Sequence, residues 1–231
     1  MRWLVIRPQP GADATARRLR LAGHEAVVMP LFAVQPVAWI SPLPDQYDAL
    51  LFTSGNAVRA AGQKLDSLRG LPVLAVGAAT ARAASELNLA VAATGNSGVQ
   101  GILRTAQQLG YRRLLWLAGE DRTAVSVPAE ISLDTRIVYR SAELSAPDCF
   151  SDNVNAVDAI MLHSRRAAEY FGRLCDGQSI DRATLSLAAL SPNILESAGS
   201  GWKTIGTAPE PNDASLLSQL ESCFTNIASD P

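Results

Sequence analysis

The chain has 231 residues, of which 48% are hydrophobic, and a formal net charge of −2. This length and composition allow one large or two small globular domains with packed cores. The near-neutral charge and the lack of a Lys/Arg run give no electrostatic footprint for nucleic acid or an anionic membrane, so neither is an expected partner. The first apolar run stops at Pro8, too short for a signal peptide, and no later stretch is long enough to span a bilayer, so the sequence predicts a cytoplasmic protein.

In chain order, short apolar segments predict a series of β-strands with helical patterns between most of them. The predicted strands lie near Arg2–Ile6, Glu25–Met29, Ala49–Phe52, Val73–Val76, Ala90–Ala93, Arg113–Leu117, Arg136–Tyr139, Asp158–Leu162, Leu185–Ala189 and Trp202–Ile205. Ala12–Ala22 and Val99–Leu109 are examples of segments with the apolar spacing of a helix. Strands that alternate with helices indicate an α/β fold, with parallel sheets covered on both faces.

One segment of the chain occurs twice. Residues 47–58 align with residues 157–168 at a constant offset, and both copies read as a buried strand, a hydroxyl-bearing turn and the start of a helix. Leu71–Leu103 and Leu185–Leu217 share the same order of apolar runs and breaks. The repeat indicates two related α/β lobes and directs attention to the cleft between them.

The size of the segments predicts how they divide into lobes. Residues 1–33 are too few to bury a core alone, so they are expected to join residues 145–231 in one discontinuous lobe. Residues 40–136 then form an inserted lobe. The chain crosses between the lobes at 34–39 and 137–144, and because both crossings are apolar and β-prone, a two-stranded β-ladder is expected there.

Parallel sheets place ligands at the loops that follow the carboxyl ends of their strands. In the inserted lobe these loops are Thr53–Asn56, Gly77–Thr80, Gly95–Gly98 and Gly119–Arg122, all small, polar or glycine-containing. Helix N-termini in such loops bind carboxylates or phosphates, which predicts an anionic ligand. In the other lobe Arg7, Arg165 and Arg166 lie in matching loops and are able to face a polyanion. The alternative is that Ser54, Thr80 and Ser97 only cap helices and that Arg165 and Arg166 lie at a solvated helix start.

Standard catalytic machinery is absent from the sequence. There is no GxxxxGK[ST], strand-linked GxGxxG, GxSxG or HExxH motif, and His24 and His163 are the only histidines. Cys149, Cys175 and Cys223 are widely spaced without a CxxC, which gives little support to a disulfide framework or a zinc site. An enzyme of this sequence would have to work mainly by holding its substrate in one geometry.

The order and spacing of several short motifs resemble uroporphyrinogen-III synthases along nearly the whole chain. The motifs are the Arg7-Pro8 pair, the turn at 48–54, the segment 75–81, Gly95-Asn96, Val138-Tyr139 and the second turn at 158–164. The resemblance implies two flavodoxin-like lobes joined by a two-stranded β-ladder, with the active site between them. It also implies cyclisation of hydroxymethylbilane to uroporphyrinogen III with inversion of the terminal pyrrole ring, in tetrapyrrole biosynthesis, without a cofactor or a metal.

The resemblance also implies roles for individual residues. A linker tyrosine of the family, tied to departure of the substrate hydroxyl, falls on Tyr139; a structural tyrosine on the ladder is the alternative. Thr53, Ser54, Thr80, Asn96 and Ser164 occupy binding-loop positions. Where the family commonly has Gly-Pro-Thr-Thr-Ala, this chain has Ser191-Pro192-Asn193-Ile194-Leu195, so both threonines are lost. Asn193 is expected to cap the helix and bind substrate in their place, although the loss also fits a diverged paralogue with weak activity.

Two other functions fit the same sequence. One is a non-catalytic two-lobed binding protein that closes on an anionic ligand. The other is a different enzyme, such as a nucleotide-sugar glycosyltransferase, against which the missing phosphate loop and Asp-x-Asp pattern count. The expected partner is the small-molecule substrate, the enzyme that makes hydroxymethylbilane is a candidate protein partner, and a monomer is expected because nothing in the sequence indicates a large exposed apolar face.

Overall fold

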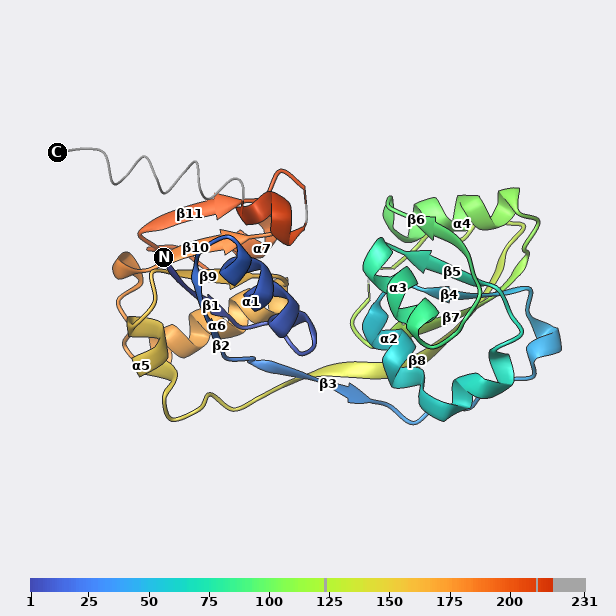
Figure 1. Cartoon of the computed structure of the whole chain (residues 1–231), viewed down its shortest axis with the longest axis horizontal. Coiled ribbons are helices and arrows are strands. Elements are labelled where there is room, and N and C mark those ends of the chain that lie inside the picture. Colours follow the sequence, from blue (N-terminus) through green and yellow to red (C-terminus); the bar gives the residue numbers. More distant parts are fainter. Residues whose placement is uncertain (123, 211, 218–231) are drawn as a thin grey trace. The chain divides into compact units, whose positions relative to one another are not determined.

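The computed structural model describes residues 1–122, 124–210 and 212–217 (Figure 1). The chain folds as two compact units. Unit 1 consists of residues 1–33 with the chain from 143 onward, and unit 2 consists of residues 34–142. No helix among the described residues is long and apolar enough to cross a membrane.

Unit 1 is built on a five-stranded parallel sheet. Its strands are β1 (Arg2–Val5), β2 (Glu25–Val28), β9 (Ala159–Leu162), β10 (Ser186–Ala189) and β11 (Thr204–Thr207), in the order β11-β10-β9-β1-β2. Its helices are α1 (Gly11–Leu21), α5 (Phe150–Asn155), α6 (Arg165–Gly177) and α7 (Pro192–Glu196), with a 3₁₀ turn at Arg182–Thr184, and residues 213–217 are also helical. Numbered in chain order this is the 2-1-3-4-5 arrangement of flavodoxin-like sheets.

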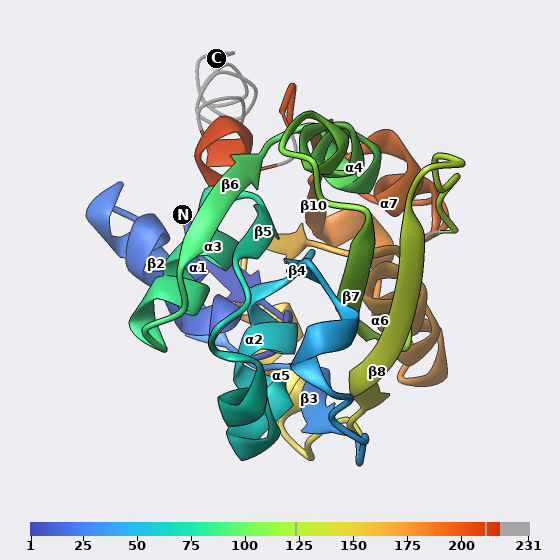
Figure 2. The same ribbon diagram turned by 90° about the vertical axis from the view of Figure 1, so that its right-hand side faces the viewer.

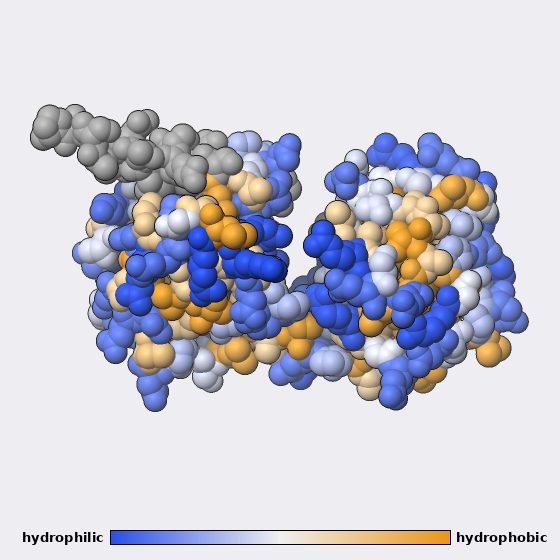
Figure 3. Space-filling view, viewed as in Figure 1, coloured by the Kyte–Doolittle hydropathy of each residue, from blue (hydrophilic) through white to orange (hydrophobic). Residues whose placement is uncertain are grey.

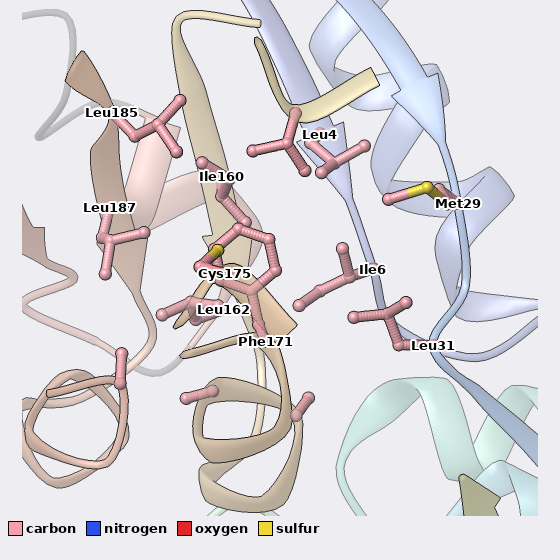
Figure 4. Close-up of a cluster of buried hydrophobic side chains, with 14 of the residues drawn as sticks. Leu4, Ile6, Met29, Leu31, Ile160, Leu162, Phe171, Cys175, Leu185 and Leu187 are labelled. Atoms are coloured by element: carbon pink, nitrogen blue, oxygen red, sulfur yellow. The ribbon is translucent and has the colours of Figure 1, made fainter. Parts of the chain in front are cut away.

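Alternate residues of each central strand in unit 1 pack against helices on opposite faces. Leu4 of β1 and Leu162 of β9 pack on the α6 side of the sheet, and Figure 4 shows both on the same side as Phe171 of that helix. Trp3 and Val5 point the other way and pack with α1. The period of two in a strand therefore produces a sheet buried on both faces, as a parallel sheet requires.

Unit 2 is built on a six-stranded sheet. Its strands are β3 (Phe32–Pro36), β4 (Ala49–Phe52), β5 (Val73–Val76), β6 (Val91–Gly95), β7 (Arg113–Gly119) and β8 (Ser132–Glu143), in the order β3-β8-β7-β4-β5-β6. Its helices are α2 (Gly55–Ala61), α3 (Ala78–Glu86) and α4 (Gly98–Gln108), with 3₁₀ turns at Pro44–Gln46 and Gly62–Leu68. Figure 2 shows β6, β5, β4, β7 and β8 side by side. The α2 and α3 helices pack on one face and α4 on the other.

The outermost pair of this sheet is the ladder through which the chain enters and leaves unit 2. The β3 strand lies next to β8, with hydrogen bonds from the Val37 N–H to the Val138 carbonyl (2.9 Å) and from the Leu144 N–H to the Leu31 carbonyl (2.9 Å). The α/β class with parallel sheets and a two-stranded ladder is confirmed. The sequence predicts a strand near Arg136–Tyr139 and a ladder strand at 137–144, whereas β8 already begins at Ser132, because its first part pairs with β7.

The two units share one sheet core in different chain orders. The β9, β10 and β11 strands of unit 1 occupy the places of β4, β5 and β6 in unit 2, and the strand register agrees: Leu50 lies opposite Val73, and Ile160 opposite Leu187. The β1 and β2 strands, which come first in the chain, occupy the places of β7 and β8, which come last in unit 2. Unit 2 is thus a circular permutant of unit 1, and the sequence repeat covers the three strands that keep their order.

The aspartate of the repeat makes the same backbone hydrogen bond in both units, to the first residue of the neighbouring strand. The Asp48 carboxylate accepts the backbone N–H of Arg113, the first residue of β7 (2.8 Å), and the Asp158 carboxylate accepts the N–H of Arg2, the first residue of β1 (2.7 Å). Each carboxylate therefore satisfies a backbone donor at the amino end of the neighbouring strand, where the ladder offers no acceptor.

The surface carries hydrophobic residues mainly as separate side chains. On the face shown in Figure 3, hydrophobic and hydrophilic residues are interspersed over each unit. The large exposed hydrophobic residues include Leu21 and Ile205 from separate segments, and Ile40 and Leu43 from the one segment between β3 and β4. Single exposed side chains of this kind are ordinary on soluble domains.

Candidate functional site

The carboxyl ends of the parallel strands define one candidate edge in each unit. The unit 1 edge consists of residues 7–10, 163–166, 190–193 and 208–210, and the unit 2 edge consists of residues 53–56, 77–80, 95–98 and 119–122. Ligands of such sheets bind where neighbouring strands send their chains to opposite faces. That point lies between β1 and β9 in unit 1 and between β4 and β7 in unit 2.

A bulge at the end of β8 determines where Tyr139 points. Ala118 of β7 lies opposite Ile137, but the next residue, Gly119, lies opposite Tyr139, so Val138 is the extra residue. Ile137 packs on the α4 face of the sheet, whereas both Val138 and Tyr139 pack on the α2 and α3 face. Strict alternation would put Tyr139 on the same face as Ile137, and the bulge turns it to the other.

Gly119 leaves the space that the Tyr139 ring occupies. A β-carbon on Gly119 would lie 2.6 Å from Cζ and 2.8 Å from the hydroxyl oxygen of Tyr139, closer than real β-carbons approach other atoms. The phenol therefore lies against the backbone at the carboxyl end of β7, beside the point where β4 and β7 diverge. Among the described residues none hydrogen-bonds to this hydroxyl, whereas the hydroxyl of Tyr47 donates to Asp134 (2.5 Å).

The turn after β4 holds two of the predicted binding residues. Ser54 is the N-cap of α2, and its hydroxyl accepts the N–H of Asn56 (3.1 Å), while Thr53 is half-buried beside it. Thr80 does not cap its helix, because Gly77, with φ of 81°, holds the N-cap position of α3 and Thr80 lies buried within the first turn. Asn96 is exposed in the turn before α4, and Ser97 holds the N-cap position there without a side-chain cap bond.

The unit 1 edge holds the other predicted residues. Ser164 caps α6 and accepts the N–H of Ala167 (3.3 Å). The expectation that Asn193 caps the next helix is wrong: Ser191 holds that position, and Asn193 lies exposed in the first turn of α7. Arg165 and Arg166 are both exposed at the start of α6, where Arg165 donates weakly to Ser197 (3.4 Å) and the Arg166 guanidinium lies over the Phe32 ring.

Arg7 lies in a buried ion cluster that the sequence does not predict. At the centre is the carboxylate of Asp213, only 6% exposed, which accepts hydrogen bonds from Thr15 (2.6 Å), Arg18 (2.8 Å) and His163 Nε2 (3.1 Å). Arg7 Nη1 lies 3.6 Å from the same carboxylate and donates to Thr15 Oγ1 (3.3 Å). The cluster joins the end of β1, helix α1, the end of β9 and the helical segment 213–217.

Burial and charge set the protonation states of this cluster. Burial would raise the pKa of Asp213, but the hydrogen bonds from His163 and Thr15 and the charge of Arg7 hold that pKa well below its usual value. Burial and the nearby Arg7 charge outweigh the Asp213 contact and lower the pKa of His163. At neutral pH, Asp213 is therefore charged and His163 is neutral, so two arginines face a single buried carboxylate and the cluster keeps one positive charge.

The side chains that commonly bind metal ions do not cluster in the part of the chain that the structure describes. Among residues 1–122, 124–210 and 212–217 there is no group of three His, Cys, Asp or Glu side chains placed to hold an ion. Burial raises the pKa of the Cys175 thiol to about 12, so this cysteine is an inert part of the core; Cys149 is exposed, and Cys223 lies outside the described residues.

Comparison with known proteins identifies a family. The sequence model of the family described as uroporphyrinogen-III synthase HemD matches residues 13–218. Among solved structures, a uroporphyrinogen-III synthetase from Helicobacter pylori matches with a TM-score of 0.63 at 16% identity, over 96% of this chain and 100% of that one. A mutant uroporphyrinogen III synthase from Thermus thermophilus matches with a TM-score of 0.51 at 16% identity, over 98% and 99% of the two chains. At this identity the structures support the fold alone. No curated protein sequence matches the chain.

Sequence reasoning missed Asp213, Thr15 and Arg18, and it named Gly119 only as part of a predicted binding loop. Asp213 lies in the segment that aligns with the α4 region of the first copy, but nothing in that alignment shows that an aspartate there faces Arg7. Gly119 was visible as a glycine at a strand end, a position that often permits close approach of a neighbouring group. Only the bulge in β8 shows that this group is Tyr139.

Proposed function

The chain belongs to the uroporphyrinogen-III synthase family, and from this premise we propose that it closes hydroxymethylbilane to uroporphyrinogen III with Tyr139 acting on the leaving hydroxyl. The family acts on a small-molecule substrate, a linear tetrapyrrole rich in carboxylates. Closure requires loss of a hydroxyl as water, attack of the resulting azafulvene by the substituted carbon of the terminal ring, and rearrangement of the spiro intermediate. The protein's task is to fold the substrate for that attack and to assist the leaving group.

The placement of Tyr139 is the observation that carries this proposal. The β8 bulge and the bare Gly119 backbone together hold the phenol at the unit 2 edge with its hydroxyl uncommitted among the described residues. A tyrosine that served only to pack on the ladder would not require a bulge to turn it or a glycine to admit it. The Tyr139 O–H donates its proton to the departing hydroxyl, which leaves as water. The pyrrole ring that carried this hydroxyl loses its N–H proton to become the azafulvene, and that proton replaces the one given by the phenol.

The neighbouring turns supply groups for the substrate's carboxylates. Thr53 and Ser54 follow β4, and Thr80 and Asn96 lie in the next two turns along the same edge. Helix N-termini attract anions through their free N–H groups and their dipole. At the unit 1 edge we assign Arg7, Ser164 and Asn193 to binding; Asn193, exposed in the first turn of α7, is free to donate its side-chain amide to a carboxylate.

The ratio of product isomers tests the function. Hydroxymethylbilane is generated in situ, the products are oxidised, and the type I and type III isomers are separated by chromatography, with and without the protein. Free substrate closes to type I without ring inversion, so we expect the type III isomer to form in proportion to the protein present. If a folded sample yields type I alone, the catalytic proposal fails and a non-catalytic binding protein becomes the better account.

We further propose that the chain acts as a cytoplasmic monomer. Apart from Ile40 and Leu43, its large exposed hydrophobic residues come from different segments, which supports the monomer. Light scattering at micromolar concentration is expected to give the mass of one chain, and a stable dimer mass would contradict the proposal. Direct transfer of substrate from the enzyme that makes hydroxymethylbilane is a separate possibility, which co-sedimentation of the two purified proteins would reveal.

A further inference from the structure

Arg7 is fixed on one side and open on the other. Its Nη1 is the atom that donates to Thr15 and approaches Asp213, while among the described residues none accepts a hydrogen bond from Nε or Nη2. These two nitrogens form the side of the guanidinium that matches a carboxylate with two parallel hydrogen bonds. The Arg7 side chain as a whole is 33% exposed, so it is not sealed off from a ligand.

The surroundings of that open side also suit an anion. A β-carbon on Gly11 would lie 2.6 Å from Arg7 Nε and 2.9 Å from Nη2, so only glycine admits the guanidinium at this place. Gly11 is the first residue of α1, and in the described structure its N–H has no acceptor, unlike those of Ala12 (to Pro8, 3.1 Å) and Asp13 (to Gln9, 3.2 Å). A carboxylate on Nε and Nη2 would meet a helix N-terminus as well as the guanidinium.

We propose that Asp213 is a positioning residue, which with Thr15 holds Arg7 so that Nε and Nη2 bind one carboxylate of the substrate. The inference rests on the proposed function. Asp213 itself is buried and its oxygens are committed to Thr15, Arg18 and His163, so it acts through Arg7 and does not touch the substrate. Because Arg18 accompanies Arg7, the single carboxylate of Asp213 does not cancel the positive charge of the site, and the attraction for an anion remains.

A double-mutant cycle on KM tests the proposal. The variants are Arg7→Gln, Asp213→Asn and the double variant, with initial rates of type III formation measured over a range of hydroxymethylbilane concentrations. We expect Arg7→Gln to raise KM about tenfold with kcat within about twofold, as loss of one charge-assisted carboxylate contact predicts. Asp213→Asn is expected to raise KM several-fold alone and to add nothing in the Arg7→Gln background, because its effect passes through Arg7.

Matched controls separate positioning from folding. Asp48→Asn removes another carboxylate that pairs with an arginine, Arg113 (2.7 Å), at the amino end of β4, and should leave KM unchanged. If Asp213→Asn does not fold, Thr15→Val removes the hydroxyl that bonds both Asp213 and Arg7 while keeping the side-chain shape, and its rise in KM should likewise vanish when Arg7 is already Gln.

The outcomes distinguish the inference from the function. Type I product alone from the unaltered protein contradicts the proposed function itself. If the unaltered protein makes type III, the positioning role is overturned by Asp213→Asn raising KM as much in the Arg7→Gln background as alone, or by either single variant leaving KM unchanged.

Discussion

The two units have the same sheet core but different side chains at the carboxyl ends of their strands. Both have the same order of core strands, the same register between equivalent strands, an aspartate that starts the neighbouring strand and a serine that caps the next helix. At the point where strands diverge, however, unit 2 presents an uncommitted phenol over a bare glycine, and unit 1 presents an arginine held by a buried carboxylate.

The difference shows which residues carry the fold and which carry the chemistry. The shared residues are apolar side chains of the strands and side chains that cap backbone N–H groups. Their contacts and hydrogen bonds are made within their own unit. The residues that differ lie at the carboxyl ends of the strands. The Tyr139 hydroxyl and the Arg7 Nε and Nη2 groups have no hydrogen-bond acceptor among the described residues. We therefore assign leaving-group chemistry to the unit 2 edge and carboxylate binding to the unit 1 edge.

The largest effect is expected from Gly119→Ala. The added β-carbon would overlap the Tyr139 ring, and since β7 is a central strand, the phenol must move while the backbone stays. We expect kcat to fall about a hundredfold, the scale of a lost general acid, with KM changing less. Steady-state kinetics of type III formation measure this. Gly70→Ala is the control, because nothing lies within 4 Å of a β-carbon there, and an equal loss in both variants would show that Gly119 does not act through Tyr139.

The second effect concerns stability and contrasts Asp213 with Asp48. Asp213→Ala leaves Arg7 without its buried counter-charge and should lower the free energy of unfolding by about 3 kcal/mol. Asp48→Ala removes a more exposed pair and two backbone bonds, and should cost about 1–2 kcal/mol. Urea unfolding followed by circular dichroism gives both values. Equal losses would show that the cluster at the unit 1 edge is no more tightly coupled to folding than the pair in unit 2.

The pH dependence of stability just below neutral pH should come from the unit 1 cluster, because His163 lies there. The pKa of His163 is lowered in the folded protein, so below its usual value of about 6.5 the unfolded chain binds a proton that the folded chain does not. The pKa of Asp213 is lowered too, so the same holds below about 4. Stability is therefore expected to fall as the pH falls through both ranges. His163→Gln should flatten the change below about pH 6.5 in urea unfolding curves, and an unchanged slope would exclude His163 as its source.

The smallest effects are expected from the serine caps of α2 and α6. Ser54→Ala and Ser164→Ala each remove one hydroxyl acceptor from a helix N-terminus, and each should lower the unfolding free energy by about 1 kcal/mol. Each serine accepts one backbone N–H in the first turn of its helix, from Asn56 (3.1 Å) and from Ala167 (3.3 Å), so the two losses should agree to within about 0.5 kcal/mol. A clear inequality in thermal or urea unfolding would indicate that one serine has a further partner.

The sequence predicts the framework well because the framework follows local rules. The strand Ala49–Phe52 and the helix near Ala12–Ala22 follow from apolar spacing, and the repeat aligns Leu50 with Ile160 as the sheet register does. The circular permutation was not predicted, because periodicity indicates which segments are strands and does not indicate which strands are neighbours.

The site is less predictable because it depends on contacts between distant segments. Tyr139 was assigned through the family resemblance, but the bulge that turns it arises from the pairing of β7 with β8. Asp213 lies 198 residues from Thr15 in the chain, and no local pattern marks the buried bond between them. Asn193 was expected at a helix cap that Ser191 occupies, since Pro192 at the first helical position leaves the cap to the residue before it.

Single-turnover kinetics of Tyr139→Phe test the central claim most directly. With enzyme in excess over hydroxymethylbilane and at saturation, the rate of type III formation reports chemistry without substrate binding. The assignment of the phenol to the leaving hydroxyl predicts a rate about a hundredfold lower in Tyr139→Phe. Tyr47→Phe, which removes a hydroxyl bonded to Asp134, should keep the unaltered rate. A Tyr139→Phe protein that forms type III at the unaltered rate under saturation would contradict the account.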